Sequence, residues 1–579
     1  MGEVKPERRR LKKLALLAGA GIIAFAGAAF AYNAIDRHYA PVPEVVQAAE
    51  SYAENRPNFL VIIVDDLGFS DLGAFGGEIE TPHLDALALG GVRLTGFHTA
   101  PTCSPTRAQL LTGTDNHLNG LGRMAEAPSL QQIGRRGYEG ALRADVATLP
   151  EILLANGYRT IHSGKWHLGT KLKQDPSRRG FQHSFTLAEA GHNHYGVISK
   201  GLFVKTTYRE NGTPVKSLPD DFYSSDYFTD KLIENLEVSR KADGDKPFFA
   251  YLAYTAPHWP LHAPDESVSK YRGKYDQGYD VLREQRTRRQ VELGLVPEGT
   301  ARAENPKVKP WASLTAEEKK HYIATQEVYA GMVDRVDVNV GRLVQYLKDS
   351  GQYDNTVILF LSDNGAEGLD LRTADIPILS GLVKKSDNRV ENIGKSTSLT
   401  SVGAGWAEAG TAPSRLYKGY QSEGGTRVAA FVSYGGDGRA LTQKGGISPV
   451  FGTVRDVTPS FLELAGIRPH DGNWQGRKVV PIDGHSWADV WFGKGQHVHP
   501  DNAAVGAELF GSKSIRKGDW KILSLRGEAW ALYNLAEDPG EARDLSTQFP
   551  EKKAELVRDW EVYARTNNVR LPKKAVYTP

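Results

Sequence analysis

The most regular feature of this chain is a set of apolar runs that do not alternate with polar residues. Residues 59–64, 248–254 and 356–362 are rich in β-branched and aromatic side chains throughout. Strands that are buried on both faces of a parallel sheet have this pattern. We therefore predict that these runs are central strands of an α/β sheet.

Apolar residues at helical spacing lie between these runs. Residues 145–156 carry that spacing and stop at Gly157, a residue suited to follow a helix. A longer helix is predicted from the capping box that begins at Thr315 to about Ser350. Its apolar positions are those of core residues.

Two further stretches differ from the rest of the chain in composition and pattern. Residues 265–312 are charged with few apolar anchors, so we predict an exposed insertion without chemistry. After about residue 500, short antiparallel strands are predicted around a Gly-Asp turn, followed by a charged amphipathic helix near 550–566. We expect a large domain over 57–499 and a smaller C-terminal subdomain over 500–579.

The N-terminus has the form of an export signal. A cationic stretch at 8–13 precedes an uncharged Ala/Gly/Leu/Ile run at 14–31, which ends in Ala-Phe-Ala. We predict a signal peptide over 1–31, with an uncleaved signal anchor as the alternative, and a linker over 32–56. Either alternative places the remaining chain outside the cytoplasm, and we expect a periplasmic protein or one anchored to the membrane.

Composition narrows the function classes. A chain of 579 residues is too long for one ordinary core. The formal net charge is only +2, and no basic tract is interleaved with aromatic residues, so nucleic acid is not an expected partner. The membrane is expected as a partner only through the possible N-terminal anchor.

Acidic residues follow two of the predicted central strands. Asp65 and Asp66 come directly after the first run, and Asp363 and Asn364 come after the third. The carboxyl ends of such strands lie where α/β sheets bind their ligands. Oxygen-only donors favour Ca²⁺, with Mg²⁺ less favoured, over zinc. The alternative for Asp66, an N-cap, does not explain two acids in succession.

The only cysteine of the chain, Cys103, lies in an unusual place. A lone buried cysteine is most often an inert small apolar residue. Here it follows a polar, Pro-punctuated turn and precedes a helix that we expect to start near Pro105. With Arg107 one turn away, we expect electropositive surroundings suited to an anion.

Two loops carry further candidates that are weak by themselves. Lys165 and His167 lie on a Gly-flanked turn after a short strand, and taken alone they are best explained as solvated side chains. His258 lies between prolines just past the run at 248–254, where a packed loop histidine is an even alternative.

Several of these stretches resemble the sulfatase family. Residues 103–113, Cys-x-Pro-Thr-Arg-x-x-Leu-Leu-Thr-Gly, resemble its first signature, and residues 157–169 resemble its second, in the same order. Residues 417–428, with Lys418 before Glu-Gly-Gly-Thr-Arg-Val, resemble another stretch of the family. The resemblance implies an alkaline-phosphatase-like α/β fold: a large mixed, mainly parallel sheet flanked by helices, plus a smaller C-terminal antiparallel sheet with a helix.

The resemblance also implies a cofactor set and a partner. In the family, the cysteine is oxidised to formylglycine by a separate maturation enzyme, and the hydrated aldehyde attacks a small-molecule sulfate ester beside calcium. The residues implied to surround the metal are Asp65, Asp66, Cys103, Asp363 and Asn364.

The remaining roles follow from the same resemblance. Asp363 would take the proton of the attacking hydroxyl, Arg107 and Lys165 would hold the hydrated aldehyde, and His167 would be the base of the elimination step. The residues implied to bind the sulfate are Lys165, His258 and Lys418, with His258 or Lys418 protonating the leaving oxygen.

Alternatives stay open at this point. Relatives that use the same aldehyde are phosphodiesterases or phosphonate monoester hydrolases. Two alternatives belong to other functional classes. The protein could be an exported binding protein whose cysteine is not converted, or a thiol hydrolase that uses a Cys-His pair. Residues 255–264 and 417–428 look most like those of bacterial arylsulfatases, so aryl sulfates are the expected substrates.

Overall fold

The computed structural model describes residues 56–196, 206–435, 441, 445–492 and 495–573. The predicted signal segment at 1–31 and all but the last residue of the predicted linker lie outside the described residues. Within the described ranges, no helix combines the length and apolar character needed to cross a membrane.

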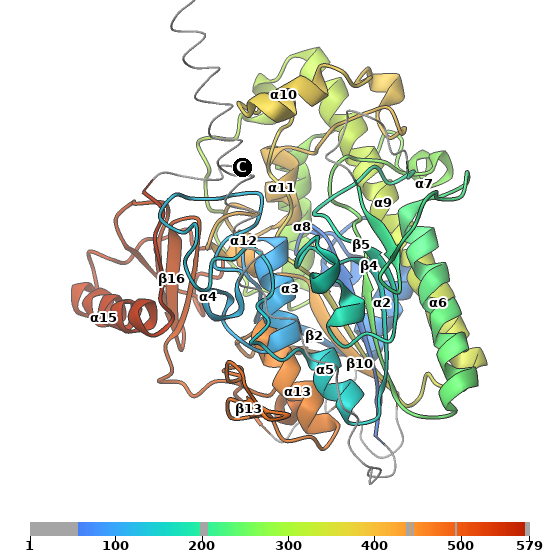
Figure 1. The fold of residues 1–579 in the computed structure, drawn as a ribbon. Helices are drawn as coiled ribbons and strands as arrows, with labels where there is room; N and C mark the ends of the chain where they lie inside the picture. Colours follow the sequence, from blue (N-terminus) through green and yellow to red (C-terminus); the bar gives the residue numbers. More distant parts are fainter. Residues whose placement is uncertain (1–55, 197–205, 436–440, 442–444, 493–494, 574–579) are drawn as a thin grey trace, which may run out of the picture.

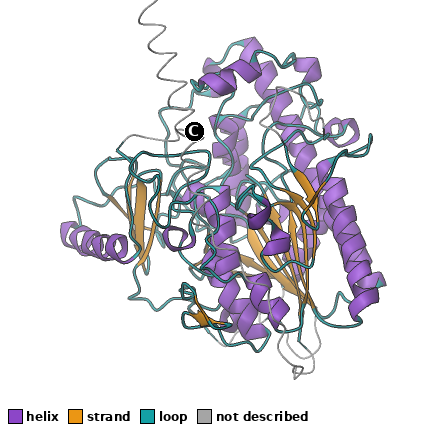
Figure 2. Ribbon diagram, viewed as in Figure 1, coloured by secondary structure: helices purple, strands orange, loops and turns teal. Residues whose placement is uncertain are grey.

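A mixed sheet forms the centre of the molecule (Figure 2). Its strand order is β11-β2-β10-β9-β1-β8-β4-β5-β6-β7. The pairs β9–β1, β1–β8, β8–β4 and β4–β5 are parallel, and β10 joins β9 antiparallel. The strands are β1 Asn58–Val64, β2 Val92–Leu94, β4 Arg159–Lys165, β5 His183–Leu187, β6 Tyr208–Glu210, β7 Thr213–Pro214, β8 Phe248–Ala253, β9 Thr356–Ser362, β10 Ala430–Tyr434 and β11 Gly446–Ser448.

Helices cover both faces of this sheet (Figure 1). In β1, Leu60, Ile62 and Val64 enter one apolar core, which also contains side chains of α2, α6 and α9. Phe59, Val61 and Ile63 enter the other, with side chains of α3, α5 and α13. Burial on both faces explains why the run does not alternate, and it confirms the predicted central strands.

The helices begin and end at residues with clear local signals. Thr148 caps α5 and Thr315 caps α9, each in a capping box with the glutamate three residues later, so both predicted helices are confirmed. The longer helices are α2 Pro82–Gly90, α3 Cys103–Thr112, α5 Leu149–Ala155, α6 Ser224–Asp243, α8 Tyr279–Glu292, α9 Ala316–Asp349, α10 Pro377–Val383, α11 Ala404–Gly410, α13 Val457–Leu464 and α15 Pro550–Thr566. The short ones are α4 Asn116–Asn119, α7 Asp265–Ser269, α12 Glu423–Thr426 and α14 Ala488–Trp491.

Residues 265–312 differ from the prediction of an exposed insertion. They form α7 and α8, and Tyr279 packs edge-on against Trp311 with 5.2 Å between ring centroids. Arg286 is buried and its Nε lies 2.8 Å from Oε2 of Glu78. Many residues of this segment are exposed, but the prediction missed its buried anchors, because widely spaced aromatic residues and charges paired inside the protein do not form an apolar period.

The C-terminal part forms a smaller layer beside the main sheet (Figure 1). Its antiparallel sheet runs β15-β16-β17-β18, and α15 packs against it through Leu556, Trp560 and Tyr563. The strands are β15 Val505–Leu509, β16 Ser512–Lys517, β17 Trp520–Ser524 and β18 Ala531–Asn534. The predicted fold class, a large mainly parallel sheet plus a small antiparallel sheet with a helix, is therefore confirmed.

Candidate active site

The candidate site lies at the carboxyl ends of β1 and β9. Asp65 and Asp66 follow β1, and Asp363 and Asn364 follow β9, as the parallel register of the two strands requires. The amide of Asn364 donates from Nδ2 to Oδ1 of Asp66 at 2.6 Å, and the backbone N–H of Asp66 donates to Oδ1 of Asp363 at 3.3 Å. All four side chains are buried.

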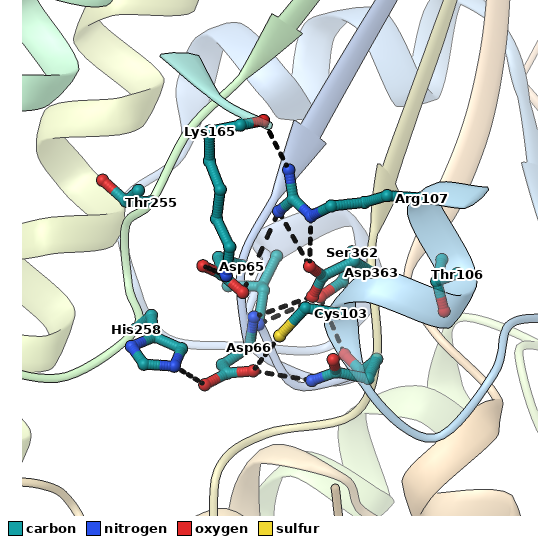
Figure 3. Close-up of polar contacts among 12 residues, drawn as sticks. Asp65, Asp66, Cys103, Thr106, Arg107, Lys165, Thr255, His258, Ser362 and Asp363 are labelled. Carbon is teal, nitrogen blue, oxygen red and sulfur yellow. Dashed lines mark hydrogen bonds and ion pairs between the residues drawn. The ribbon is translucent and has the colours of Figure 1, made fainter. Parts of the chain in front are cut away.

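Cys103 is the first residue of α3 and faces this acidic group (Figure 3). Its Sγ lies 4.0 Å from Oδ1 of Asp66, and only 1% of the residue is exposed. The helix therefore begins two residues earlier than expected. Four buried side chains each offer one possible metal-ligand atom, and these atoms all lie within 4.8 Å of one another: Asp65, Asp66, Cys103 and His258.

Arg107 joins the helix to both strand ends. Its Nε donates to Oδ2 of Asp363 at 2.9 Å, and its Nη1 donates to the carbonyl of Lys165 at 3.3 Å. Its Nη2 lies 3.9 Å from Oδ1 of Asp65 (Figure 3). One guanidinium thus fixes the relation between α3, β9 and the end of β4.

Two ammonium groups neutralise the acids. Lys165, at the end of β4, brings Nζ to 2.5 Å from Oδ2 of Asp65. Lys418 brings Nζ to 2.8 Å from the carboxylate of Asp66 and 3.1 Å from Oε2 of Glu367. Both lysines are buried, so the site is a charged cluster inside the protein rather than a solvated patch.

The two candidate histidines lie in different surroundings. Nε2 of His258 is 3.6 Å from Oδ2 of Asp66, so the structure brings His258 to the acidic group (Figure 3). His167, two residues after Lys165, pairs instead with Glu126, at 3.3 Å between Nε2 and Oε2. His167 and Asp66 both have positive φ, 56° and 69°, a strained backbone that is concentrated at functional sites.

The acids of the site raise the pKa values of their neighbours. Burial raises the pKa of Asp66 to about 8, with Asp65 adding to the rise and Lys418 opposing it. Burial and the charge of Asp65 also raise the pKa of Asp363 to about 6. Burial, Asp363 and Asp65 raise the pKa of Cys103 well above its usual range. Lys165 and Lys418 oppose this rise in the pKa of Cys103.

A divalent cation fits this donor set. Oδ1 of Asp65 and Oδ1 of Asn364 are buried without a hydrogen-bond partner in the described part of the chain. Unpartnered buried oxygens are costly, and the raised pKa values of Asp66 and Asp363 come first from burial and then from the neighbouring acids. A hard cation bound by these oxygens would relieve both.

Sequence reasoning did not find several residues that support the site. Glu367 contacts Lys418, and Glu126 contacts His167, but neither belongs to a recognisable motif. Nε2 of His194 lies 3.1 Å from the carbonyl of His258, and Nδ1 bonds the hydroxyl of Ser224. His194 belongs to a Gly-His-Asn-His run, and only the fold shows that it supports the loop of His258.

The loop that carries Lys418 is held by the C-terminal sheet. Nζ of Lys521, on β17, lies 2.7 Å from both Oε1 of Glu423 and Oε1 of Glu541. The backbone N–H of Gln421 donates to Oγ of Ser512 at 3.1 Å. The smaller layer therefore takes part in placing a residue of the site.

Comparison with known proteins identifies the family. The Sulfatase family model matches residues 57–467, which is more than half of the chain. The chain belongs to the sulfatase family. It hydrolyses sulfate esters as a member of that family, and its cysteine lies at a buried acidic cluster consistent with a metal-bound formylglycine site.

Two curated relatives of this sulfatase are similar over most of their length. An uncharacterized sulfatase of Schizosaccharomyces pombe is 47% identical over 89% of this chain and 95% of the relative. An arylsulfatase of Klebsiella aerogenes is 37% identical over 76% of this chain and 93% of the relative. The crystal structure of Ps i-CgsB in complex with k-i-k-neocarrahexaose shares the fold, with a TM-score of 0.63, 24% identity, and 90% and 95% of the two chains covered.

Proposed function

We propose that this sulfatase hydrolyses aryl sulfates, using a formylglycine made from Cys103 beside a calcium ion. The observation that carries the proposal is the placement of Cys103 at the start of α3, with its Sγ 4.0 Å from the Asp66 carboxylate between two strand ends. The 37% identity to the Klebsiella arylsulfatase supports the aryl specificity.

The residues that would hold the calcium ion are Asp65, Asp66, Asp363 and Asn364, together with the modified residue 103. When bound, the ion would add two positive charges and polarise the oxygens around it. The formylglycine would supply a hydroxyl nucleophile that cysteine lacks.

The remaining work falls to fixed side chains. Arg107 holds Asp363, which accepts the proton of the attacking hydroxyl. Lys165, from the end of β4, and Lys418, from its loop, offer ammonium groups to the sulfate oxygens. His258 lies beside Asp66 and binds the same sulfate group. Either His258 or Lys418 donates a proton to the leaving oxygen. His167 is the base of the elimination step, which follows the departure of the alcohol.

Substitution of the nucleophile tests the proposal. We expect Cys103→Ser to attack 4-nitrophenyl sulfate once and then stop as a covalent sulfate ester, because serine has no second hydroxyl for elimination. Intact-protein mass spectrometry would show the adduct on Cys103→Ser and not on the control Cys103→Ala. Sustained turnover by the serine variant would contradict the mechanism.

The matured wild-type protein tests the substrate class. The peptide containing residue 103 is expected to weigh less than the cysteine form, because oxygen replaces sulfur and two hydrogens are lost. Hydrolysis of 4-nitrophenyl sulfate should exceed that of a nitrophenyl phosphate diester and should fall when a calcium chelator is added. Faster cleavage of the diester would favour a phosphodiesterase, and preference for a sulfated sugar would overturn the aryl assignment.

A further inference from the structure

Glu126 makes a contact in the active site that no motif predicts. Its Oε2 lies 3.3 Å from Nε2 of His167, whose side chain is only 4% exposed. Half of the Glu126 side chain is exposed. Nδ1 of His167 is buried and makes no hydrogen bond to the described residues.

This contact determines which ring nitrogen of His167 is protonated. An ionised carboxylate can only accept a hydrogen bond, so Nε2 must carry the hydrogen that is shared with Glu126. In the neutral imidazole, Nδ1 then keeps its lone pair. The buried, unpartnered nitrogen is therefore the one that can accept a proton.

Burial is the main reason that the imidazole of His167 stays neutral. Burial lowers the pKa of His167, and Lys165 and Arg107 lower it further. Glu126 opposes this shift through its charge and its hydrogen bond. The imidazole is thus available as a base at neutral pH, and Glu126 sets how strong a base it is.

The backbone around Glu126 holds it in place. Nε of Arg123 donates to the carbonyl of Tyr138 at 2.8 Å, which closes the loop on which Glu126 lies. The N–H of Leu142, where the chain leaves this loop, donates to the carbonyl of Leu168 at 3.1 Å, next to His167. The loop and the turn are therefore joined by a backbone hydrogen bond as well as by the contact between Glu126 and His167.

We propose that Glu126 is a positioning residue that fixes the ring orientation and the Nε2–H tautomer of His167, so that Nδ1 serves as the proton acceptor. The inference rests on the proposed role of His167 as the base of the elimination step. It adds a residue that acts through His167 without touching the substrate.

Kinetics of Glu126 variants test the proposal. We expect Glu126→Ala to lower kcat for 4-nitrophenyl sulfate by roughly 10- to 100-fold, the range for loss of a carboxylate that orients a functional histidine. KM should change little, because the proposed sulfate-binding residues are unchanged: Lys165, His258 and Lys418. Leu130→Ala, at an 87% exposed position of the same loop, is the control and should behave as wild type.

The pH profile separates positioning from a general structural effect. In Glu126→Gln the amide oxygen can still accept from Nε2–H, so most of kcat should be retained. The lost negative charge should lower the pKa of His167, while Lys165 and Arg107 still oppose protonation. The acid limb of kcat should therefore move to lower pH in Glu126→Gln.

A direct readout needs no turnover. Nitrogen-15 NMR of histidine-labelled Cys103→Ala protein should show a protonated Nε2 and an unprotonated Nδ1 at His167, assigned from the signal lost in His167→Gln. Adding Glu126→Ala should yield a mixture of both tautomers. An unchanged tautomer together with wild-type kcat and pH profile in Glu126→Ala would overturn the inference, whereas absence of sulfatase activity in the wild-type protein would instead overturn the proposed function.

Discussion

The carboxylate of Asp66 lies at the point where the fixed charges of the site meet. Lys418 approaches it at 2.8 Å, and Lys418 also approaches Glu367 at 3.1 Å. The lysine thus offsets two acids of the site. If the site binds calcium and a sulfate ester as proposed, Lys418 should oppose binding of the cation and favour binding of the ester.

Replacing Lys418 should separate these two dependences. We expect Lys418→Met to bind Ca²⁺ roughly tenfold more tightly, because one nearby positive charge is lost. Turnover of 4-nitrophenyl sulfate should fall by roughly 10²- to 10³-fold, as when one charge-stabilising donor is removed. Chelator competition and steady-state kinetics measure the two effects. Lys270→Met, which breaks a partly exposed pair with Asp334, is the control, and weaker Ca²⁺ binding by Lys418→Met would contradict the argument.

Single residues were predictable where a contiguous motif carries them. Asp65 and Asp66 end an apolar run, and Cys103 and Arg107 share one helical turn, so local spacing was informative. Glu126 was not predictable, because only the fold brings its loop to His167. Long-range pairs of this kind leave no periodic signal in one sequence.

The strand ends determine how precisely the site is built. Gly164 precedes Lys165 on β4 with φ of 113°, and a Cβ there would lie 2.0 Å from the carbonyl oxygen of Ala253 on β8. Close contact between β4 and β8 therefore requires glycine at this position. The same contact places Lys165 against Asp65.

Enlarging Gly164 should disturb both stability and activity. We expect Gly164→Ala to push β4 from β8, to destabilise the fold by about 3 kcal/mol or more, and to abolish most activity. Gly134→Ala is a matched control, since Gly134 also has positive φ, 71°, but no atom lies within 4 Å of the added Cβ. It should cost only about 1–2 kcal/mol and leave kcat unchanged. Thermal unfolding and kinetics of both variants provide the measurement, and equal effects would count against the close-contact argument.

Elements were predictable when their signal was local. The capping box at Thr315 and the unbroken apolar run of β1 fixed α9 and the central sheet. Residues 265–312 were misjudged, since a buried pair such as Arg286 with Glu78 has the composition of a solvated segment. Charge alone does not reveal whether its partner is water or protein.

The two sheets of the molecule meet through buried ion pairs. His117 on α4 lies 2.8 Å from Oδ1 of Asp115 and 2.9 Å from Oε2 of Glu508, which belongs to β15. Tyr563 on α15 donates its hydroxyl to Oδ2 of Asp115 at 2.9 Å. The contact between α4 and the C-terminal sheet therefore depends on the protonation of His117.

This histidine predicts a pH dependence of stability. Burial would lower the pKa of His117, but Asp115 and Glu508 raise it to about 9, above the value near 6.5 of an unfolded chain. A raised folded-state pKa adds stability that is complete below pH 6.5 and is lost as the pH rises through about 9. The wild-type melting temperature should fall across that range. His117→Gln, which does not titrate, should have a lower melting temperature at pH 6 and a flatter profile, and parallel profiles would exclude this role.

The burial of Cys103 also implies an order of events in time. An enzyme that oxidises the thiol, as the proposed function requires, would have to reach a residue that is 1% exposed in the folded protein, with its Sγ 4.0 Å from the Asp66 carboxylate. The chain is made from its N-terminus, so residue 103 emerges long before residues 363 and 418, and before the sheet that holds the Lys418 loop. We expect the oxidation to take place in that interval. A chain that folds first would be stable, well packed and permanently inactive.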